Sequence, residues 1–287
     1  MKIPKRIQPL VDDGLVDDVI RQLMSGKEAT VYVVRCGSEI RCAKVYKEAN
    51  KRSFKKASQY QEGRKVRNSR RARAMEKGSK YGRHEQEQSW QTAEVDALHR
   101  LDDAGVRVPK PYCCVDGVLL MELVTDDEGD VAPRLGDVDM PTEIALEDHA
   151  MMMTYIVRML CAGLVHGDLS EFNVLVDETG PVIIDLPQAV DAAGNNHAEM
   201  MLARDVNKIR DYYSLYAPEL KNTQYAKEIW ALYENGELHP ESKLSGKFAE
   251  NEQVADVDRV LDEIKAAWQE EQDRILRMSD EGTELKF

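Results

Sequence analysis

The spacing of apolar residues divides the chain into a β-rich first part and a helical second part. Alternating apolar positions over 28–48 predict two strands that meet at a turn on Gly37, and 106–124 predict further strands around an Asp116-Gly117 hairpin turn. Ahead of these strands, apolar residues recur at helical spacing, so a short amphipathic helix is expected there. Its apolar positions are Leu15, Val16, Val19, Ile20 and Leu23.

Helical spacing dominates the remainder of the chain. One helix is expected from about Glu85 to Ala104, where Gly105 stops it. A longer helix is expected from Pro141 to Gly163, with proline first and glycine last. Two short strands flank a turn at 178–180. Further helices are expected over 204–216, 223–236 and 251–278.

A connection rich in acidic residues, glycine and proline, over 125–141, separates the predicted sheet from the helices. We therefore predict an α+β fold with two lobes and a cleft between them. The small β-rich N-lobe would comprise residues 1–124, including a basic insertion at 51–83, and the helical C-lobe residues 125–287.

Charge is spread unevenly over the 287 residues. The insertion at 51–83 holds 13 lysines and arginines against two acids, a net charge of +11, whereas the whole chain carries −13. Clustered cations attract phosphate groups, so this segment is a candidate contact for RNA or a ribosomal particle. A solvated, disordered loop would have the same composition, and the sequence leaves both interpretations open.

Targeting and redox signals are weak. The first residues have no apolar signal-peptide core, and the most apolar later stretch, 151–165, is too short to span a bilayer. We therefore expect a cytoplasmic protein with no membrane partner. The five cysteines match neither a disulfide framework nor a zinc site, and reduced core thiols are expected.

The stretch "LVHGDLSEFNVLV", residues 164–176, contains the first residues suited to phosphoryl transfer. Asp168 and Asn173 stand five apart, and Asp185 follows twelve residues later at the end of an apolar strand. Transfer of a γ-phosphoryl group needs a carboxylate to orient or deprotonate the attacking oxygen and oxygen ligands for Mg²⁺. Asp168 fits the first role, while Asn173 and Asp185 fit the second, so ATP and Mg²⁺, with Mn²⁺ as an alternative ion, are the expected cofactors.

A lysine and a glutamate upstream complete this set. Lys44 lies inside a predicted strand, where its ammonium could reach the α- and β-phosphates. Glu94 shares a helix face with Trp90, Leu98 and Leu101, so its carboxylate sits within an apolar stripe. Burying it unpaired would be costly, and an ion pair with Lys44 would satisfy it.

Adenine requires apolar surfaces above and below it and a backbone edge beside it. Strand alternation places two apolar side chains near Lys44 as a roof, and residues next to the expected metal ligands can form the floor and rear. The segment "LLMELV" would connect the lobes and present its backbone. The candidates are Val31 and Cys42 for the roof, Leu175 and Ile184 for floor and rear, Met121 as a guard residue, and the backbones of Glu122 and Val124.

Taken together, "SGKEATVY", "CAKVYK", "WQTAEVDAL", "GVRVPKP", "LLMEL", "HGDLSEFN" and "IIDLPQ" resemble the RIO family of atypical serine/threonine protein kinases, its bacterial members above all. The resemblance implies a protein-kinase-like fold, binding of ATP with Mg²⁺, and serine autophosphorylation or ATP hydrolysis. It implies that the Ser25 hydroxyl and the loop amides grip phosphate where extra glycines are missing, with Lys27 adding charge. It also implies a second role for Asp185 as a phosphate acceptor, and archaeal and eukaryotic relatives act on small-subunit ribosome precursors.

The sequence departs from ordinary kinases after Asp185. Fewer than twenty residues precede the next expected helix, so the activation segment is truncated and the peptide-docking platform is expected to be missing. Pro187 occupies the position of the D-F-G glycine and cannot adopt a positive φ. Gly167 replaces the arginine that senses a phosphorylated activation loop, so regulation by that route is not expected.

Two other functions remain open at this stage. A small-molecule phosphotransferase of the aminoglycoside or choline kinase type has a similar H-G-D-x-x-x-x-N loop, although it is disfavoured by "SGKEATVY". An ATP-switched protein that binds RNA or the ribosome would explain the basic insertion without much phosphate transfer. The protein substrate is unknown, and the chain itself is one candidate, through Ser53, Ser58, Ser69 and Ser79.

Overall fold

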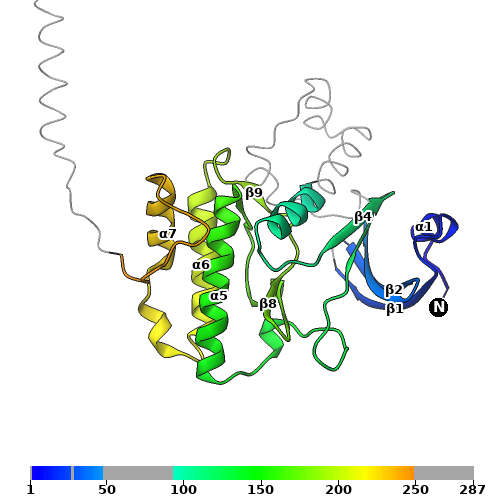
Figure 1. Cartoon of the computed structure of the whole chain (residues 1–287), viewed down its shortest axis with the longest axis horizontal. Coiled ribbons are helices and arrows are strands. Elements are labelled where there is room, and N and C mark those ends of the chain that lie inside the picture. The colour runs from blue at the N-terminus through cyan, green and yellow to red at the C-terminus, as the bar shows by residue number, and fades with distance from the viewer. Residues whose placement is uncertain (1, 27–28, 48–92, 249–287) are drawn as a thin grey trace, which may run out of the picture. The chain divides into compact units, whose positions relative to one another are not determined.

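The computed structural model describes residues 2–26, 29–47 and 93–248, which belong to one compact unit, Met1–Phe248 (Figure 1). The basic insertion at 51–83 and the helix expected over 251–278 lie outside the described residues. No helix in the described ranges is both long enough and apolar enough to cross a membrane. The lobe boundary near residue 124 stays a prediction.

A five-stranded antiparallel sheet forms the first part of the described chain, with strand order β1-β2-β3-β5-β4. Its turns confirm the predicted hairpins, because Gly37, Asp116 and Gly117 all adopt positive φ, a conformation that glycine and aspartate tolerate best. The strands are β1 Asp18–Ser25, β2 Ala29–Cys36, β3 Glu39–Tyr46, β4 Pro111–Val115 and β5 Val118–Glu122.

The predicted amphipathic helix over Leu15–Leu23 is wrong, because this stretch forms the edge strand β1. The short helix lies earlier, as α1 Gln8–Asp12. Two irregularities in the β1–β2 register, between Val19 and Arg21 and between Gln22 and Met24, interrupt the alternation of the strand. The apolar residues of this stretch therefore do not alternate with a period of two, and their spacing resembles that of an amphipathic helix.

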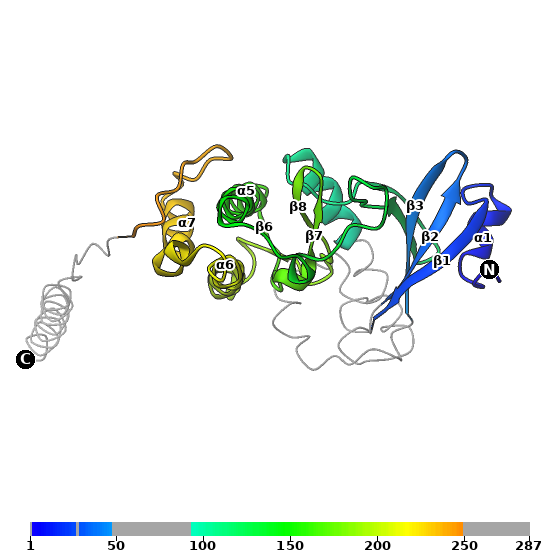
Figure 2. The same ribbon diagram turned by 90° about the horizontal axis from the view of Figure 1, so that it is seen from below.

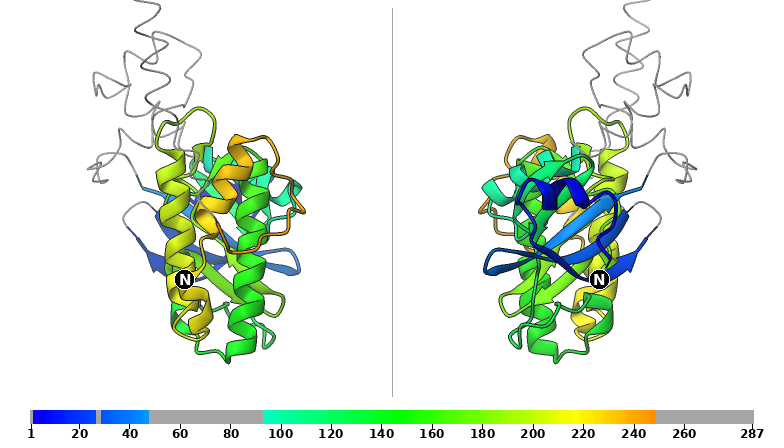
Figure 3. Two further views of the ribbon diagram at one scale, coloured as in Figure 1. Left: turned by 90° about the vertical axis from the view of Figure 1, so that its left-hand side faces the viewer. Right: turned by 90° about the vertical axis from the view of Figure 1, so that its right-hand side faces the viewer.

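The second part is mainly helical, as expected. Its long helices α5 Thr142–Cys161 and α6 Ala198–Tyr213 run alongside each other, and α7 Tyr225–Glu234 packs against both (Figures 2 and 3). The helix over 93–103 ends before Gly105, whose φ of +70° reverses the chain. The remaining elements are short: 3-10 helices η2 Leu135–Asp137, η3 Glu171–Asn173 and η4 Pro218–Asn222, and strands β6 Leu164–Val165, β7 Val174–Asp177, β8 Gly180–Ile183 and β9 Val190–Asp191.

Two large apolar clusters hold these elements together. One packs α1 against the sheet through residues such as Leu10, Val19 and Val34. The other joins the helices to the sheet, since Tyr46 and Leu119 share it with the side chains of α5 and α6. Residues on this second side of β3 are therefore placed next to the helical part.

His149 is the most conspicuous polar group in the helical core. It is 1% exposed, its ring lies 5.9 Å from Tyr213 and 5.3 Å from Tyr225, and its Nε2 has no hydrogen-bond partner in the described structure. Burial, and secondarily the charge of Arg210, lowers the pKa of His149 to about 4. The folded protein therefore resists protonation of this ring.

We expect His149→Phe to remove an acid-sensitive component of stability. The unfolded imidazole takes up a proton near pH 6.5 and the folded one only near pH 4, so its stabilising contribution is complete above pH 6.5 and declines as the pH falls towards 4. Urea unfolding of both proteins should diverge by up to about 1.4 kcal/mol per pH unit in that window. Burial raises the pKa of Asp148 to about 6, but this residue is present in both proteins, so its contribution to the pH dependence cancels. Parallel pH profiles of the two unfolding free energies would contradict this prediction.

Candidate active site

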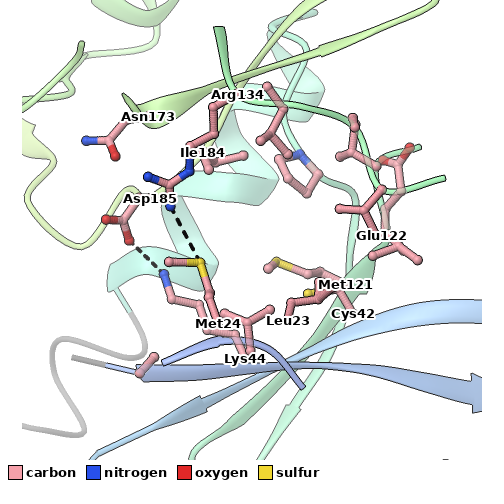
Figure 4. Close-up of a pocket in the computed structure, with 18 of the residues that line it drawn as sticks. Leu23, Met24, Cys42, Lys44, Met121, Glu122, Arg134, Asn173, Ile184 and Asp185 are labelled. Atoms are coloured by element: carbon pink, nitrogen blue, oxygen red, sulfur yellow. Dashed lines mark hydrogen bonds and ion pairs between the residues drawn. The ribbon is translucent and has the colours of Figure 1, made fainter. Parts of the chain in front are cut away.

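A cavity of about 590 Å³ lies between the sheet and the segments that carry the predicted metal ligands (Figure 4). Most of the residues predicted to bind nucleotide or metal line it. They are Val31, Cys42, Lys44, Glu94, Met121, Glu122, Val124, Asn173, Leu175, Ile184 and Asp185. Side chains from distant parts of the sequence therefore converge on one space.

Lys44 on β3 occupies the centre of the site. Its Nζ lies 2.6 Å from Oε1 of Glu94 and 2.9 Å from Oδ1 of Asp185, so the expected pair with Glu94 forms and gains a third member. Burial alone would lower the pKa of Lys44, but the two carboxylates outweigh it and raise the pKa. Lys44 in turn lowers the pKa of Asp185. Both partners therefore stay charged over the physiological pH range.

Tyr46, the next residue on the same face of β3, also contacts the Lys44–Glu94 pair. The hydroxyl of Tyr46 donates a hydrogen bond to the second carboxylate oxygen of Glu94. Burial and the adjacent carboxylate raise the pKa of Tyr46, so the phenol remains protonated and able to donate. Both oxygens of the buried Glu94 are thus satisfied, which removes most of the cost of burying it.

The loop between β6 and β7 carries the predicted base. The Asp168 carboxylate is about half exposed, and its Oδ1 lies 3.4 Å from Nζ of Lys208 on α6. The Nδ2 of Asn173 donates to the backbone oxygen of Asp168 at 2.8 Å, which directs the amide oxygen of Asn173 away from that bond. Asp168 itself does not line the cavity, whereas Asn173 and Asp185 do.

Two buried side chains fix this loop. Asp205 on α6 accepts hydrogen bonds from the backbone amides of Gly167, at 2.7 Å, and Leu169, at 3.1 Å. Burial, partly offset by these bonds and nearby cations, raises the pKa of Asp205 to about 6. His166 accepts from the Asp168 amide and contacts the Ile184 carbonyl at 3.0 Å, so the base loop and the residue before Asp185 are joined through one ring.

Two residues of the site, Gly167 and Asp185, have positive backbone φ angles. Gly167 has φ +81°, a conformation that an arginine side chain would find strained, so the glycine is explained by local geometry. Asp185 has φ +66° despite its side chain. Such a conformation costs about 1–3 kcal/mol and persists where surrounding contacts impose it, here the bond to Lys44.

The predicted phosphate-loop residues are less well placed. Ser25 ends β1 outside the cavity lining, with its hydroxyl 3.2 Å from that of Thr30 and 2.9 Å from Nζ of Lys47. Lys27 lies outside the described residues. The phosphate-gripping role of both stays a prediction.

The connecting segment after β5 uses some of its polar groups internally. The Glu122 amide donates to the Lys110 carbonyl at 2.9 Å, and the Val124 carbonyl accepts from Ala132 at 3.0 Å. The Glu122 side chain bonds both terminal nitrogens of Arg107, which also contacts Asp177 at 2.8 Å. This ion network ties the connecting segment to β7.

Several residues of the site are absent from the set predicted from the sequence, among them Tyr46, Arg134, Asp205 and Lys208. Tyr46 shares the strand face of Lys44, so alternation alone could have identified it. Asp205 interrupts the apolar stripe of α6, the same signal that identified Glu94. Arg134 and Lys208 lie in segments whose placement beside the cavity and the loop depends on tertiary packing.

The sheet with its buried lysine–glutamate pair, the helical part and the aspartate-bearing loops together define a protein-kinase-like, two-lobed α+β fold. Solved structures agree: a Rio2 kinase from Chaetomium thermophilum matches over 95% of this chain and 82% of its own, with a TM-score of 0.54 and 20% identity. The Rio2 kinase-ADP/Mg²⁺-phosphoaspartate complex from that organism matches over 80% of this chain and 70% of its own, with a TM-score of 0.53 and 21% identity. At this level of identity the likeness establishes the fold alone.

The sequence comparisons define the family. The RIO domain model matches residues 30–226. The RIO-type serine/threonine-protein kinase Rio1 of Haloferax volcanii is 35% identical over 72% of this chain and 67% of its own length. The human serine/threonine-protein kinase RIO1 is 30% identical over 70% of this chain. The chain belongs to the RIO domain family and is a phosphotransferase of the RIO-type serine/threonine kinase class, as its motifs predicted.

The relatives differ from this chain in length. The matched region spans 34% of the human protein and 32% of the Encephalitozoon cuniculi RIO1 homologue. The shared part is therefore the RIO domain, and activities that depend on other regions of those proteins do not follow from it.

We expect Glu94→Ala to lower both stability and nucleotide affinity. The change leaves Tyr46 without its acceptor and Lys44 with one carboxylate in place of two, so unfolding free energy should fall by about 3 kcal/mol or more. The control is Glu39→Ala, which breaks an exposed pair with Arg41 and should cost no more than about 1 kcal/mol. Urea denaturation compares the two variants, and equal losses would contradict the importance of the buried pair.

Proposed function

We propose that this protein is an ATP- and Mg²⁺-dependent serine/threonine protein kinase that phosphorylates itself or another protein, or hydrolyses ATP when water replaces the hydroxyl. The observation that supports it most is the convergence of Lys44, Glu94, Asn173 and Asp185 on one cavity beside Asp168. ATP binding and Mg²⁺ use are properties that kinase relatives would share.

The residues present suit magnesium and a nucleotide. Mg²⁺ binds through one or two protein oxygens with substrate phosphates and water completing its shell. Asn173 has its amide nitrogen occupied by Asp168, which leaves its oxygen as a ligand, and Asp185 has one carboxylate oxygen beyond the one that Lys44 contacts. A bound Mg²⁺ would neutralise charge on the β- and γ-phosphates. Mn²⁺, which accepts the same oxygen ligands, is an alternative ion.

Lys44 would hold the nucleotide while remaining in its ion pairs. An ammonium has three donors, and the contacts with Glu94 and Asp185 use two of them, so one remains for a phosphate oxygen. Adenine would lie between Val31 and Cys42 on one side and Leu175 on the other. Because the Glu122 amide and Val124 carbonyl are already bonded, the base edge would meet the Glu122 carbonyl and the Val124 amide.

In the transfer step, the substrate hydroxyl oxygen forms a bond to the γ-phosphorus, and the bond from that phosphorus to the bridging β–γ oxygen breaks. ADP leaves with the bonding electron pair, and the hydroxyl proton passes to the Asp168 carboxylate. Lys208 holds this carboxylate from α6, while Asp205 and His166 fix the loop on which it lies. A second role of Asp185 as a phosphate acceptor stays a prediction.

The alternatives receive less support. A small-molecule phosphotransferase would share the H-G-D loop, but the family match is to the RIO domain and to serine/threonine kinases. The candidate autophosphorylation serines at 53, 58, 69 and 79 lie outside the described residues and stay predictions.

We expect Asp168→Asn to lower autophosphorylation and ATP turnover by about 100-fold or more, because the amide cannot accept the hydroxyl proton. ATP affinity should change little, since Asp168 lies outside the cavity lining. Transfer from radiolabelled ATP measures the first quantity and calorimetric titration the second. Asp211→Asn, which alters an exposed carboxylate paired with its neighbour Arg210, is the matched control and should retain activity. Full turnover in Asp168→Asn would remove the assigned base.

We also propose that the basic insertion at 51–83 contacts RNA, on the basis of its charge of +11. Binding of a fluorescent single-stranded RNA should weaken steeply with salt, because each neutralised phosphate releases counterions. Deleting 51–83, or replacing its lysines and arginines by glutamine at constant length, should flatten this salt dependence. A salt slope unchanged in both variants would rule out this contact.

A further inference from the structure

Two arginines of the cavity lining, Arg21 and Arg134, form no ion pair with a described residue, and Arg134 is the one that lies near Asp185 (Figure 4). Lys44 is held by two carboxylates, but Arg134, which also lines the cavity, forms no ion pair with any described residue. The contact of its guanidinium is a hydrogen bond from Nη2 to the sulfur of Met24, at 3.6 Å. A thioether is a weak acceptor, so this bond would be exchanged readily for one to a charged oxygen.

The backbone at Arg134 is fixed from both sides. The Val176 amide donates to the Pro133 carbonyl at 3.0 Å, and Arg134 itself pairs with Leu175, the predicted floor of the cavity. The next residue, Leu135, is fully buried and begins η2, whose Asp137 amide returns to the Arg134 carbonyl at 2.9 Å. The base of the side chain is therefore held in place, and only its tip needs to adjust to a ligand.

The tip lies beside the predicted metal ligands. Figure 4 shows the Arg134 guanidinium reaching from the segment before η2 towards Met24, with Asp185 and Asn173 on the same side of the cavity. Phosphates bound at Asp185 and Asn173 would thus lie near this cation.

We propose that Arg134 binds the phosphate chain of ATP, giving up its contact with Met24 to do so. A guanidinium is planar, always charged and able to bond two phosphate oxygens at once. It would supply the charge that Lys44 only partly provides, because Lys44 is already neutralised by Glu94 and Asp185. This inference rests on the proposed function, since it concerns the same nucleotide.

The experiment compares ligands that differ in their phosphates. Calorimetric titrations of the full-length protein with ATP, ADP and adenosine, in the presence of Mg²⁺, are made for the wild type, Arg134→Ala and Arg134→Lys. Arg134→Ala should weaken ATP binding by about 10- to 100-fold, ADP binding by less or equally, and leave adenosine binding unchanged. Arg134→Lys should restore part of the loss, since it returns the charge without the fork. Arg35→Ala removes an exposed arginine of β2 that does not line the cavity and should leave all three affinities unchanged.

The possible results separate this inference from the proposed function. Equal weakening of ATP and adenosine binding would mean that Arg134 only shapes the cavity, and tight ATP binding by Arg134→Ala would remove it from the site; either result overturns the inference while ATP binding stands. A wild-type protein that binds adenosine and ATP equally, or neither, would overturn the proposed function itself. Thermal melting of each variant confirms that losses do not arise from unfolding.

Discussion

The contact on which the site depends is the ion triad of Lys44, Glu94 and Asp185, in which Lys44 and Glu94 are buried and the Asp185 carboxylate is about half exposed. It joins the sheet, the helix over 93–103 and the segment after β8, which lie far apart in the sequence. A buried pair of charges rarely stabilises a protein more than well-packed apolar side chains would, because desolvation consumes most of the attraction. The burial of Lys44 with Glu94 is therefore better explained by a need for charge in the cavity than by a gain in stability. Tyr46 completes the arrangement, since it satisfies the Glu94 oxygen that Lys44 does not reach.

A second set of contacts positions the loop that faces this triad. Asp205 accepts hydrogen bonds from two backbone amides of the loop, and His166 links the loop to Ile184, the residue before Asp185. Gly167 allows the required left-handed turn, and Asp185 is held in one by its bond to Lys44. Only residues 186–197 separate Asp185 from α6, so little chain is available to rearrange between them. The predicted base and the predicted metal ligands are thus held in place by the fold, with only residues 186–197 between Asp185 and α6.

Several elements of the fold and residues of the candidate site could be predicted from the sequence. The hairpins at Gly37 and Asp116-Gly117 and the helix from Pro141 to Gly163 were predictable because glycine, aspartate and proline have strong local conformational preferences. Glu94 was predictable because a carboxylate in an apolar stripe needs a partner. The edge strand β1 was not, because two irregularities in its pairing concealed the alternation. Lys208 and Arg134 were not predictable either, since nothing local to them indicates that α6 meets the loop at Asp168 or that the Pro133–Leu135 backbone pairs beside Leu175.

The charges around the cavity bear on the roles of Lys208 and Arg134 in binding a nucleotide. Lys44 with Glu94 and Asp185 carries a net charge of −1, and Asp168 with Lys208 is neutral, so the motif residues alone present no excess of positive charge to a nucleotide. A metal ion bound by Asn173 and Asp185 would make the net charge positive, but only at its own position in the cavity. Arg134 lies near Asp185 (Figure 4) without an ion pair to any described residue, and the backbone of both its neighbours is held by hydrogen bonds or burial. Electrostatic stabilisation of phosphoryl transfer requires charges that are in place before the reaction. Arg134 approaches that requirement, because its backbone is held and only its guanidinium, which has no ion pair among the described residues, must exchange Met24 for a phosphate oxygen.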